Sequence, residues 1–202
     1  MKRRDMLKLT LAATAAGLAT STHAGQACPG DGTPAQFVPK QPADPQAHVS
    51  DIDKYKKCPY CGMDRKQYHH SRMLVHYSDD LADGTCSLHC AAISLSLNVD
   101  REPKAIWVGD NAVAGDTKPL VEVDKAAFLV GSKIPGVMTA NSKVAYGTEA
   151  AAQAAQAAQG GEVVKFDQAL LAAYVDMSKD VSAIRKRRAE RRRKMMEQKK
   201  QG

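Results

Sequence analysis

The chain has 202 residues, which is enough for one domain of ordinary size with extensions or for two small domains. Aromatic residues make up only 5% of it, so the composition argues against a large catalytic cavity. The formal net charge is +7, but residues 185–202 contribute +8 and residues 1–8 contribute +3, which leaves −4 for the body. Because the basic charge is confined to the two ends, it does not predict a nucleic-acid-binding domain.

Residues 1–24 have the organisation of an export signal. A basic triplet at residues 2–4 precedes an uncharged stretch over residues 9–22, and small residues suited to cleavage follow. Residues 3–8, Arg-Arg-Asp-Met-Leu-Lys, resemble the twin-arginine export signal. The apolar run is shorter than the roughly 20 residues that span a bilayer, which disfavours a membrane anchor. We therefore expect an exported, periplasmic protein.

Residues 25–50 follow the export signal and are rich in Pro, Gly and Gln, with little apolar periodicity. This composition predicts a flexible linker that tethers the domain without shaping it. Cys28 lies in this segment and offers a lipoprotein anchor as a minor alternative, because the leucine expected three positions earlier is missing.

Residues 51–178 carry the patterns of an α+β domain. Residues 88–97 have helical spacing, and Ser87 is available as a cap. Turn signals lie at residues 78–80 and 83–84. Strand-like segments are predicted at 54–58, 72–77, 105–108 and 120–123. The first unit is therefore expected to run strand, strand, helix, strand.

A similar order follows in the second half of the domain. Predicted strands at 126–130 and 143–146 precede an alanine-rich helix at 149–159, a Gly-Gly stop and a strand at 162–166. The domain is thus expected to contain two small ββα-type units. Asp167 can cap a final long helix.

Residues 179–202 are expected to continue this helix as a basic tail. Its apolar spacing stops at Ile184. A solvated tail is the simplest interpretation, and docking on an acidic partner or weak contact with a membrane surface are the alternatives. Nucleic acid is not an expected partner of an exported chain.

Four of the five cysteines form two close pairs. Cys58 and Cys61 are separated by two residues, a gap that lets both sulfurs converge on one ion. Cys86 and Cys90 form a second pair after 24 intervening residues. Four thiols in two such pairs are a strong metal-binding pattern. Four thiolates in a tetrahedral array favour zinc, whereas soft sulfur donors favour Cu(I).

Two methionines are further candidate ligands. Met63 follows Cys61 in Cys-Gly-Met, where Gly62 permits a tight turn and no large apolar neighbour suggests a core position. Met138 follows a Pro-Gly turn and can approach the same ion, although packing is the ordinary role of a methionine. The candidate ligands are Cys58, Cys61, Met63, Cys86, Cys90 and Met138.

The histidines are weaker candidates. On a helix that starts near Ser87, His89 points about 100° away from Cys90, which favours a surface position. His69 and His70 follow a turn and are expected to be solvated, while His76 lies in a strand as a buried or half-exposed residue.

Redox chemistry is the main competing interpretation of the first cysteine pair. Cys-Pro-Tyr-Cys is the active-site sequence of glutaredoxins, where the thiolate lies at a helix N-terminus. Here Gly62 directly follows the motif, and residues 64–67 lack the apolar spacing of that helix. Structural disulfides are a third alternative, but they leave Cys-Gly-Met unexplained. With no other catalytic motif above chance, we expect a metal-binding accessory protein and not an enzyme.

The cysteine motif is the first of four segments that together suggest a family. These segments are 57–63 (Lys-Cys-Pro-Tyr-Cys-Gly-Met), 106–108 (Ile-Trp-Val), 129–138 (Leu-Val-Gly-Ser-Lys-Ile-Pro-Gly-Val-Met) and 160–163 (Gly-Gly-Glu-Val). In this order they resemble the NosL family, accessory copper proteins of nitrous oxide reductase. The resemblance covers roughly residues 37–177 and implies an organomercurial-lyase-like fold of two ββα-type units.

The resemblance also implies a function. A NosL-like domain over residues 51–178 would bind Cu(I) in the periplasm and deliver it to nitrous oxide reductase or another copper enzyme, together with its maturation factors. Cys61 and Met63 match the family's Cys-x-Met pair, and Met138 lies near the position of a further family methionine. Cys86 and Cys90 would mark a branch with a thiol-richer site. Zinc in a structural module and a thiol-disulfide oxidoreductase are the alternatives.

Overall fold

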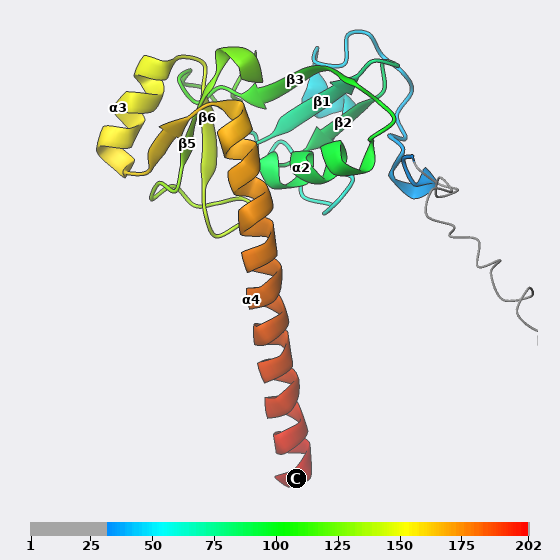
Figure 1. The fold of residues 1–202 in the computed structure, drawn as a ribbon, viewed down its shortest axis with the longest axis vertical. Helices are drawn as coiled ribbons and strands as arrows, with labels where there is room; N and C mark the ends of the chain where they lie inside the picture. The colour runs from blue at the N-terminus through cyan, green and yellow to red at the C-terminus, as the bar shows by residue number, and fades with distance from the viewer. Residues whose placement is uncertain (1–31, 202) are drawn as a thin grey trace, which may run out of the picture. The chain divides into compact units, whose positions relative to one another are not determined.

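The fold is that of a computed structural model, which describes residues 32–201 and side chains up to residue 199. The predicted export signal, Cys28 and residues 25–31 of the predicted linker lie outside the described residues. The described chain is a mixed α+β domain with two small antiparallel sheets and a long C-terminal helix, as the sequence predicts (Figure 1).

The first unit is a four-stranded sheet in the order β2-β1-β3-β4, with every neighbouring pair antiparallel. Its strands are β1 (Met73–Tyr77), β2 (Ala82–Thr85), β3 (Pro103–Gly109) and β4 (Leu120–Glu122). Helix α2 (Leu88–Leu97) connects β2 to β3 and packs on β1 and β2. The short elements η1 (Ala35–Phe37), α1 (Asp51–Lys54) and η2 (Val123–Lys125) flank this sheet in the sequence.

The second unit is a three-stranded sheet in the order β6-β5-β7, again antiparallel. Its strands are β5 (Ala127–Val130), β6 (Lys143–Tyr146) and β7 (Glu162–Val164), and helix α3 (Glu149–Gln159) connects β6 to β7. Each unit therefore has the order strand, strand, helix, strand. The first strand of each unit, β1 or β5, pairs with the other two. The predicted echo between the two halves is confirmed as a shared topology.

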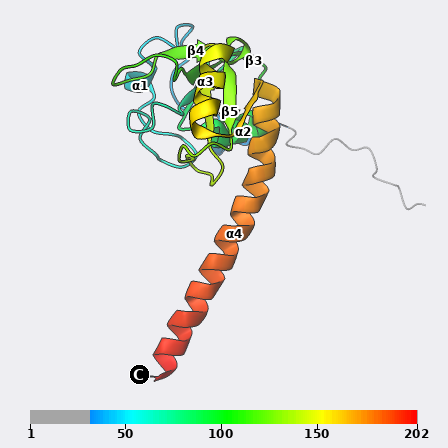
Figure 2. The same cartoon turned by 90° about the vertical axis from the view of Figure 1, so that its left-hand side faces the viewer.

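Helix α4 (Phe166–Gln201) follows the second sheet and contacts both α2 and β5 (Figures 1 and 2). Its buried Ala169 and Ala173 join the main core, which also contains Met73 and Val75 of β1 and Phe128 of β5. Small alanines at a four-residue spacing let the helix approach closely. This first part of α4 therefore holds side chains of both sheets in one core.

The distal part of α4 is different, because almost every side chain of residues 185–199 is exposed. Basic residues predominate there, and the described residues of this stretch form no ion pair within the chain. The predicted basic helical tail is therefore present as a continuation of α4. No helix over residues 32–201 combines the length and apolarity needed to cross a bilayer.

Strand β1 is buried on both faces, and each face is covered by a different part of the chain. Met73, Val75 and Tyr77 face the main core beneath α2, whereas Leu74 packs with Ala47 and Tyr55. Two-sided burial explains the continuous Met-Leu-Val-His-Tyr run. The segment before the cysteine motif therefore serves as the outer cover of this sheet.

Residues 32–50 differ from the free linker that their composition predicts. Ala47 is fully buried, and the ring of His48 stacks on Trp107 with centroids 4.7 Å apart. Phe37 likewise stacks on Tyr60 at 6.3 Å. A few apolar side chains thus hold a Pro-rich segment against the sheet, although the segment lacks regular periodicity.

Three local predictions are wrong. Residues 54–58 do not form a strand, because α1 ends at Lys54 and the chain then loops toward the cysteines. Residues 83–84 are not a turn, because Asp83 and Gly84 pair with Val75 and Leu74 inside β2. Asp167 is not the cap of α4, because that helix already begins at Phe166.

Candidate metal centre

The first two cysteines lie in a tight loop over residues 58–63. The Cys58 N–H donates to the Met63 carbonyl at 3.0 Å, and the Gly62 N–H donates to the Cys58 carbonyl at 2.9 Å. Gly62 has φ 77°, in the left-handed region that favours glycine. These constraints fold the backbone back on itself, so Cys58 and Cys61 present their sulfurs from one compact turn.

The second cysteine pair lies where β2 leads into α2. Cys86 directly follows β2, and Cys90 is one turn further on in the first part of α2, so both side chains share one side of the helix start. Ser87 occupies the N-cap position as predicted, but its side chain makes no capping hydrogen bond. The N-terminal end of this helix is therefore next to sulfur and lacks a hydroxyl cap.

The two pairs meet. The sulfurs of all four cysteines lie within 4.8 Å of one another, and all four cysteines are free thiols. Cys61 Sγ lies 3.4 Å from Cys86 Sγ, which in turn lies 3.7 Å from Cys90 Sγ. Cys58, Cys86 and Cys90 are buried, while Cys61 is only partly buried. The arrangement is a compact sulfur cluster that can hold a metal ion and that opens toward solvent at Cys61.

The pKa values of the three buried cysteines shift in opposite directions. Hydrogen bonds from the thiols of Cys86 and Cys90 lower the pKa of Cys58, and backbone N–H groups of Tyr60 and Cys86 add to this effect. The same interactions with the Cys58 thiolate raise the pKa of Cys86 and of Cys90. A metal ion bound by these sulfurs would displace their protons.

Met63 and Met138 lie differently relative to this cluster. Met63 is partly buried and packs against the cysteines together with Tyr60 and Tyr68. Met138 is 39% exposed and has φ 63°, while its neighbour Val137 packs on the cysteine cluster. The structure thus brings Met63 to the four cysteines and leaves Met138 at the surface beside them.

Arg65 anchors the end of the cysteine loop, a role that no sequence pattern indicated. Its side chain is fully buried and pairs with the Asp51 carboxylate at 2.7 Å. The same guanidinium donates to the carbonyls of Tyr55, Met73 and Thr85 and to that of Asp51. One side chain thus ties α1, the cysteine loop and both strands of the β1–β2 hairpin together.

Asp83 of β2 holds the cysteine loop by a hydrogen bond, and the sequence analysis did not predict this role. Its Oδ2 accepts hydrogen bonds from the hydroxyls of Tyr60 at 2.5 Å and Ser94 at 2.7 Å. Burial raises the pKa of Asp83, although both hydrogen bonds oppose that rise. Because Tyr60 lies between the two cysteines of the loop, the bond to Asp83 fixes the loop to β2.

The comparisons with known proteins agree with this arrangement. The sequence profile of the NosL family matches residues 48–173. This chain belongs to the NosL family. The match contains all four clustered cysteines and both units, so the family assignment and the sulfur cluster concern the same domain.

Solved structures extend the comparison to the fold. The crystal structure of the copper chaperone NosL from Shewanella denitrificans is 23% identical, with a TM-score of 0.50, and the match covers 62% of this chain and 95% of that one. The solution NMR structure of the apo-NosL protein from Achromobacter cycloclastes is also 23% identical; the match covers 47% and 82% of the two chains, with a TM-score of 0.34, too low to add to the argument. No curated protein matches the sequence. The predicted NosL-like fold is confirmed.

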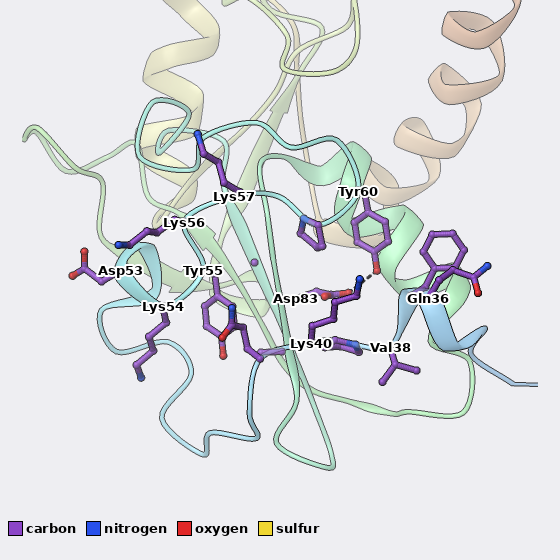
Figure 3. Close-up of a pocket in the computed structure, with 16 residues that line it drawn as sticks. Gln36, Val38, Lys40, Asp53, Lys54, Tyr55, Lys56, Lys57, Tyr60 and Asp83 are labelled. Carbon is purple, nitrogen blue, oxygen red and sulfur yellow. Dashed lines mark hydrogen bonds between the residues drawn. The ribbon is translucent and has the colours of Figure 1, made fainter.

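A cavity of about 510 Å³ in this NosL-family domain borders the cysteine loop but is not the metal centre (Figure 3). Pro59 and Tyr60 contribute to its wall, whereas none of its lining residues is a cysteine. Figure 3 shows lysines around it, of which Lys54 pairs with Asp44. The cavity lies between the N-terminal segment and the cysteine loop, and the sulfur chemistry lies elsewhere.

The histidines within residues 32–201 are not part of the four-cysteine cluster. His76 is buried, as its strand position predicts. His69 is only partly buried, and its Nδ1 accepts the Lys118 N–H at 3.1 Å, so it is not merely solvated. His89 is half-buried with an unpartnered Nδ1 and is therefore not the surface residue that its helical direction suggests.

Proposed function

We propose that this NosL-family chain is a periplasmic Cu(I)-binding accessory protein that delivers copper to nitrous oxide reductase or a related copper enzyme. The observation that carries the proposal is the set of four cysteine sulfurs within 4.8 Å, with Met63 packed against them. Thiolates and thioethers are soft ligands that select Cu(I). The export signal predicted over residues 1–24 supports a periplasmic location.

The burial pattern suits a carrier, which must hold an ion and also release it. Cys58, Cys86 and Cys90 shield the ion from water, whereas Cys61 and Met63 reach the surface in part. A ligand from a recipient protein can therefore approach from the Cys61 side and replace one sulfur at a time. Copper then passes between proteins without becoming a free ion.

A competition titration with a Cu(I) chelator tests the ligand set. Cys61→Ser should lower Cu(I) affinity by more than the roughly 10- to 100-fold typical of losing an outer-shell partner, because a direct ligand is removed. Met63→Leu should lower it less, and Met177→Leu should not change it, since Met177 packs against the main core and is not part of the cluster that contains the cysteines. Equal affinity for wild type and the Cys61 variant would overturn the proposed site.

Delivery needs its own experiment. Cu(I)-loaded protein should transfer copper to a copper-free nitrous oxide reductase. The transfer should also occur when a chelator that captures Cu(I) released into solution is present in excess. Transfer that the chelator abolishes would mean release into solution and would contradict a carrier role, while leaving Cu(I) binding intact.

Zinc binding in a structural module is the second candidate, and one observation favours it. A tetrahedral zinc ion with Zn–S bonds of about 2.3 Å requires sulfurs about 3.8 Å apart. The 3.7 Å separation of Cys86 and Cys90 is near this value, and Cys61 and Cys86 are slightly closer at 3.4 Å. The cluster geometry thus accommodates zinc as well as copper.

Thermal unfolding separates the two candidates. A structural zinc module owes much of its folding free energy to the metal, so chelation should unfold it. For a carrier with the core described above, the metal-free protein should stay folded and regain Cu(I) on addition. Loss of the folded state on chelation would favour the zinc module.

A further inference from the structure

The four cysteines differ in a way that matters for oxidation. Cys58 is 2% exposed, and Cys86 and Cys90 are fully buried. Cys61 is partly exposed, so an oxidant that must touch sulfur reaches this thiol before the other three. Access therefore selects Cys61 as the point of attack within the cluster.

Cys86 is the sulfur with which Cys61 makes a hydrogen-bond contact. Among the sulfur pairs in hydrogen-bond geometry, Cys61 and Cys86 are 3.4 Å apart, closer than Cys86 and Cys90 at 3.7 Å. A disulfide bond is about 2.05 Å long, so the two sulfurs need to approach by only about 1.4 Å. Gly62 and the partial exposure of the loop leave the Cys61 side chain room to make this movement.

We propose that the metal-free cluster is a thiol-disulfide exchange site whose bond joins Cys61 to Cys86, and not the two cysteines of Cys-Pro-Tyr-Cys. The bond would link the cysteine loop to the start of α2. Sequence spacing alone favours the Cys58–Cys61 pair, so the geometry reverses the pairing that the motif suggests.

The exchange balances with a disulfide as the oxidant. The Cys61 thiolate attacks one sulfur of the oxidant, which breaks the oxidant's S–S bond and releases one thiolate. The Cys86 thiolate then attacks the Cys61 sulfur of the mixed disulfide, and the second oxidant thiolate leaves. The two protons that Cys61 and Cys86 give up pass through water to the two released thiolates, so the protein dithiol is oxidised by two electrons and the oxidant disulfide is reduced to two thiols.

The bond has a consequence for metal loading, and this part rests on the proposed function. Oxidation would remove two of four sulfurs from the cluster, so a dithiol reductant must act on the chain before an ion can be loaded. A bound ion would in turn occupy the same thiolates and protect them. Loading would therefore follow a thiol-reducing step in the reaction sequence.

Disulfide mapping tests the pairing on the full chain. Metal-free, fully reduced protein is exposed to glutathione disulfide without oxygen, the remaining thiols are blocked with N-ethylmaleimide, and peptides are identified by mass spectrometry. The expected product is a Cys61–Cys86 peptide pair. A Cys58–Cys61 or Cys86–Cys90 pair as the main product, or no intramolecular bond, would overturn the proposal.

Single variants test the order of attack. Cys86→Ser should stop at a mixed disulfide of glutathione with Cys61. Cys61→Ser should react with glutathione disulfide much more slowly than wild type, because the accessible thiol is missing. Cys28→Ser, which changes the one cysteine outside residues 51–178, is the matched control and should still form the Cys61–Cys86 bond. Glutathione captured first on Cys58 would contradict the access argument even if a variant is less stable.

Prior metal loading separates this inference from the proposed function. Cu(I) added before the oxidant should slow formation of the bond by about tenfold or more, because coordinated thiolates are withheld from attack. An unchanged rate of oxidation after Cu(I) addition would contradict the copper site. The disulfide mapping would still test independently whether Cys61 bonds to Cys86.

Discussion

The two units of the domain share one topology but only the first carries the sulfur cluster. In each, two strands form a hairpin, a helix crosses over, and a third strand pairs with the first strand of the hairpin. Cys86 and Ser87 precede α2 at the positions that Gly147 and Thr148 occupy before α3. Equivalent positions in one fold have therefore been given different chemistry.

The helix starts show what the difference requires. Thr148 caps α3 by accepting the Ala151 N–H at 3.2 Å, whereas Ser87 makes no such bond. A side chain at Gly147 would overlap the Asp110 carboxylate, which accepts the Gly147 N–H at 2.6 Å, so a cysteine at this position would have to displace that carboxylate. One helix start is built for stability and the other leaves its sulfurs available.

The first unit also has an added support that the second lacks. The segment over residues 44–72 covers the outer face of β1 and carries the loop with Cys58 and Cys61. Arg65, paired with Asp51, holds this segment to the hairpin. A general two-unit scaffold thus acquires a candidate metal centre through a replaced cap and one anchored loop.

Removing Arg65, which anchors the cysteine loop of the first unit, should have the largest effect on stability. Arg65→Met leaves four carbonyls without their donor and weakens the pairing of Asp51, which Arg72 alone then neutralises. Buried carbonyls left without a donor cost about 1–3 kcal/mol each, so the free energy of unfolding should fall by at least about 3 kcal/mol. Urea denaturation measures it, and Lys125→Met, at an exposed pair, should change stability by less than about 0.5 kcal/mol. Equal effects would show that Arg65 is not the anchor.

Two of the buried aspartates, Asp83 and Asp176, should respond to pH with opposite signs. The pKa of Asp83 is raised above 3.8 by burial, so its contribution to stability is fully present below pH 3.8 and is lost as pH rises through the folded value. Burial opposes the shift at Asp176, but hydrogen bonds from Lys143 and Asn141 prevail and lower its pKa. Its contribution is present above pH 3.8 and is lost as pH falls through the folded value.

Asparagine substitutions measure these two contributions. Relative to wild type, Asp83→Asn should become more favourable as pH rises above 3.8, because Asn still accepts from Tyr60 and Ser94 without a buried charge. Asp176→Asn should be destabilising at neutral pH and approach wild type in acid. Urea denaturation from pH 3 to pH 8 gives both curves, and curves of the same sign would contradict the account.

The capping difference predicts a smaller effect. Thr148→Ala should destabilise the protein by about 1 kcal/mol, the usual cost of losing an N-cap hydrogen bond. Ser87→Ala should cost less than half of that, since no capping bond is lost. Thermal unfolding measures the pair, and a larger loss for Ser87 would show that it caps α2 in solution.

The basic tail should have the smallest effect. Truncation after Ile184 removes exposed side chains that form no ion pair over the described residues, so stability should change by less than about 0.5 kcal/mol. The metal-to-protein ratio, measured by elemental analysis, should be unchanged. A lost ion would show that the tail folds back on the cysteine cluster.

Patterns with strong local signals were predicted from sequence. The helical spacing and Gly160 stop of α3, and the apolar runs of β5 and β6, led to the shared topology of the units. The spacing of the four cysteines likewise predicted that their sulfurs could converge. These features depend mainly on residues close together in the chain.

Features that depend on distant partners were missed. Ala-Asp-Gly-Thr resembles a turn, yet it forms β2 because β1 supplies the pairing and Tyr60 and Ser94 bond Asp83. A lone Arg65 after the cysteine motif gives no local signal, since its acceptors come from three separate parts of the chain, residues 51–55, β1 and β2. Tertiary context decided both cases.

Competition between metals tests the central claim most directly. Reduced, metal-free protein is offered equimolar Cu(I) and Zn(II) without oxygen, and native mass spectrometry identifies the retained ion in wild type and in Cys61→Ser. We predict that wild type retains copper and that the variant loses most of it. Retention of zinc, with no copper bound by wild type, would contradict the assignment of the sulfur cluster as a Cu(I) site.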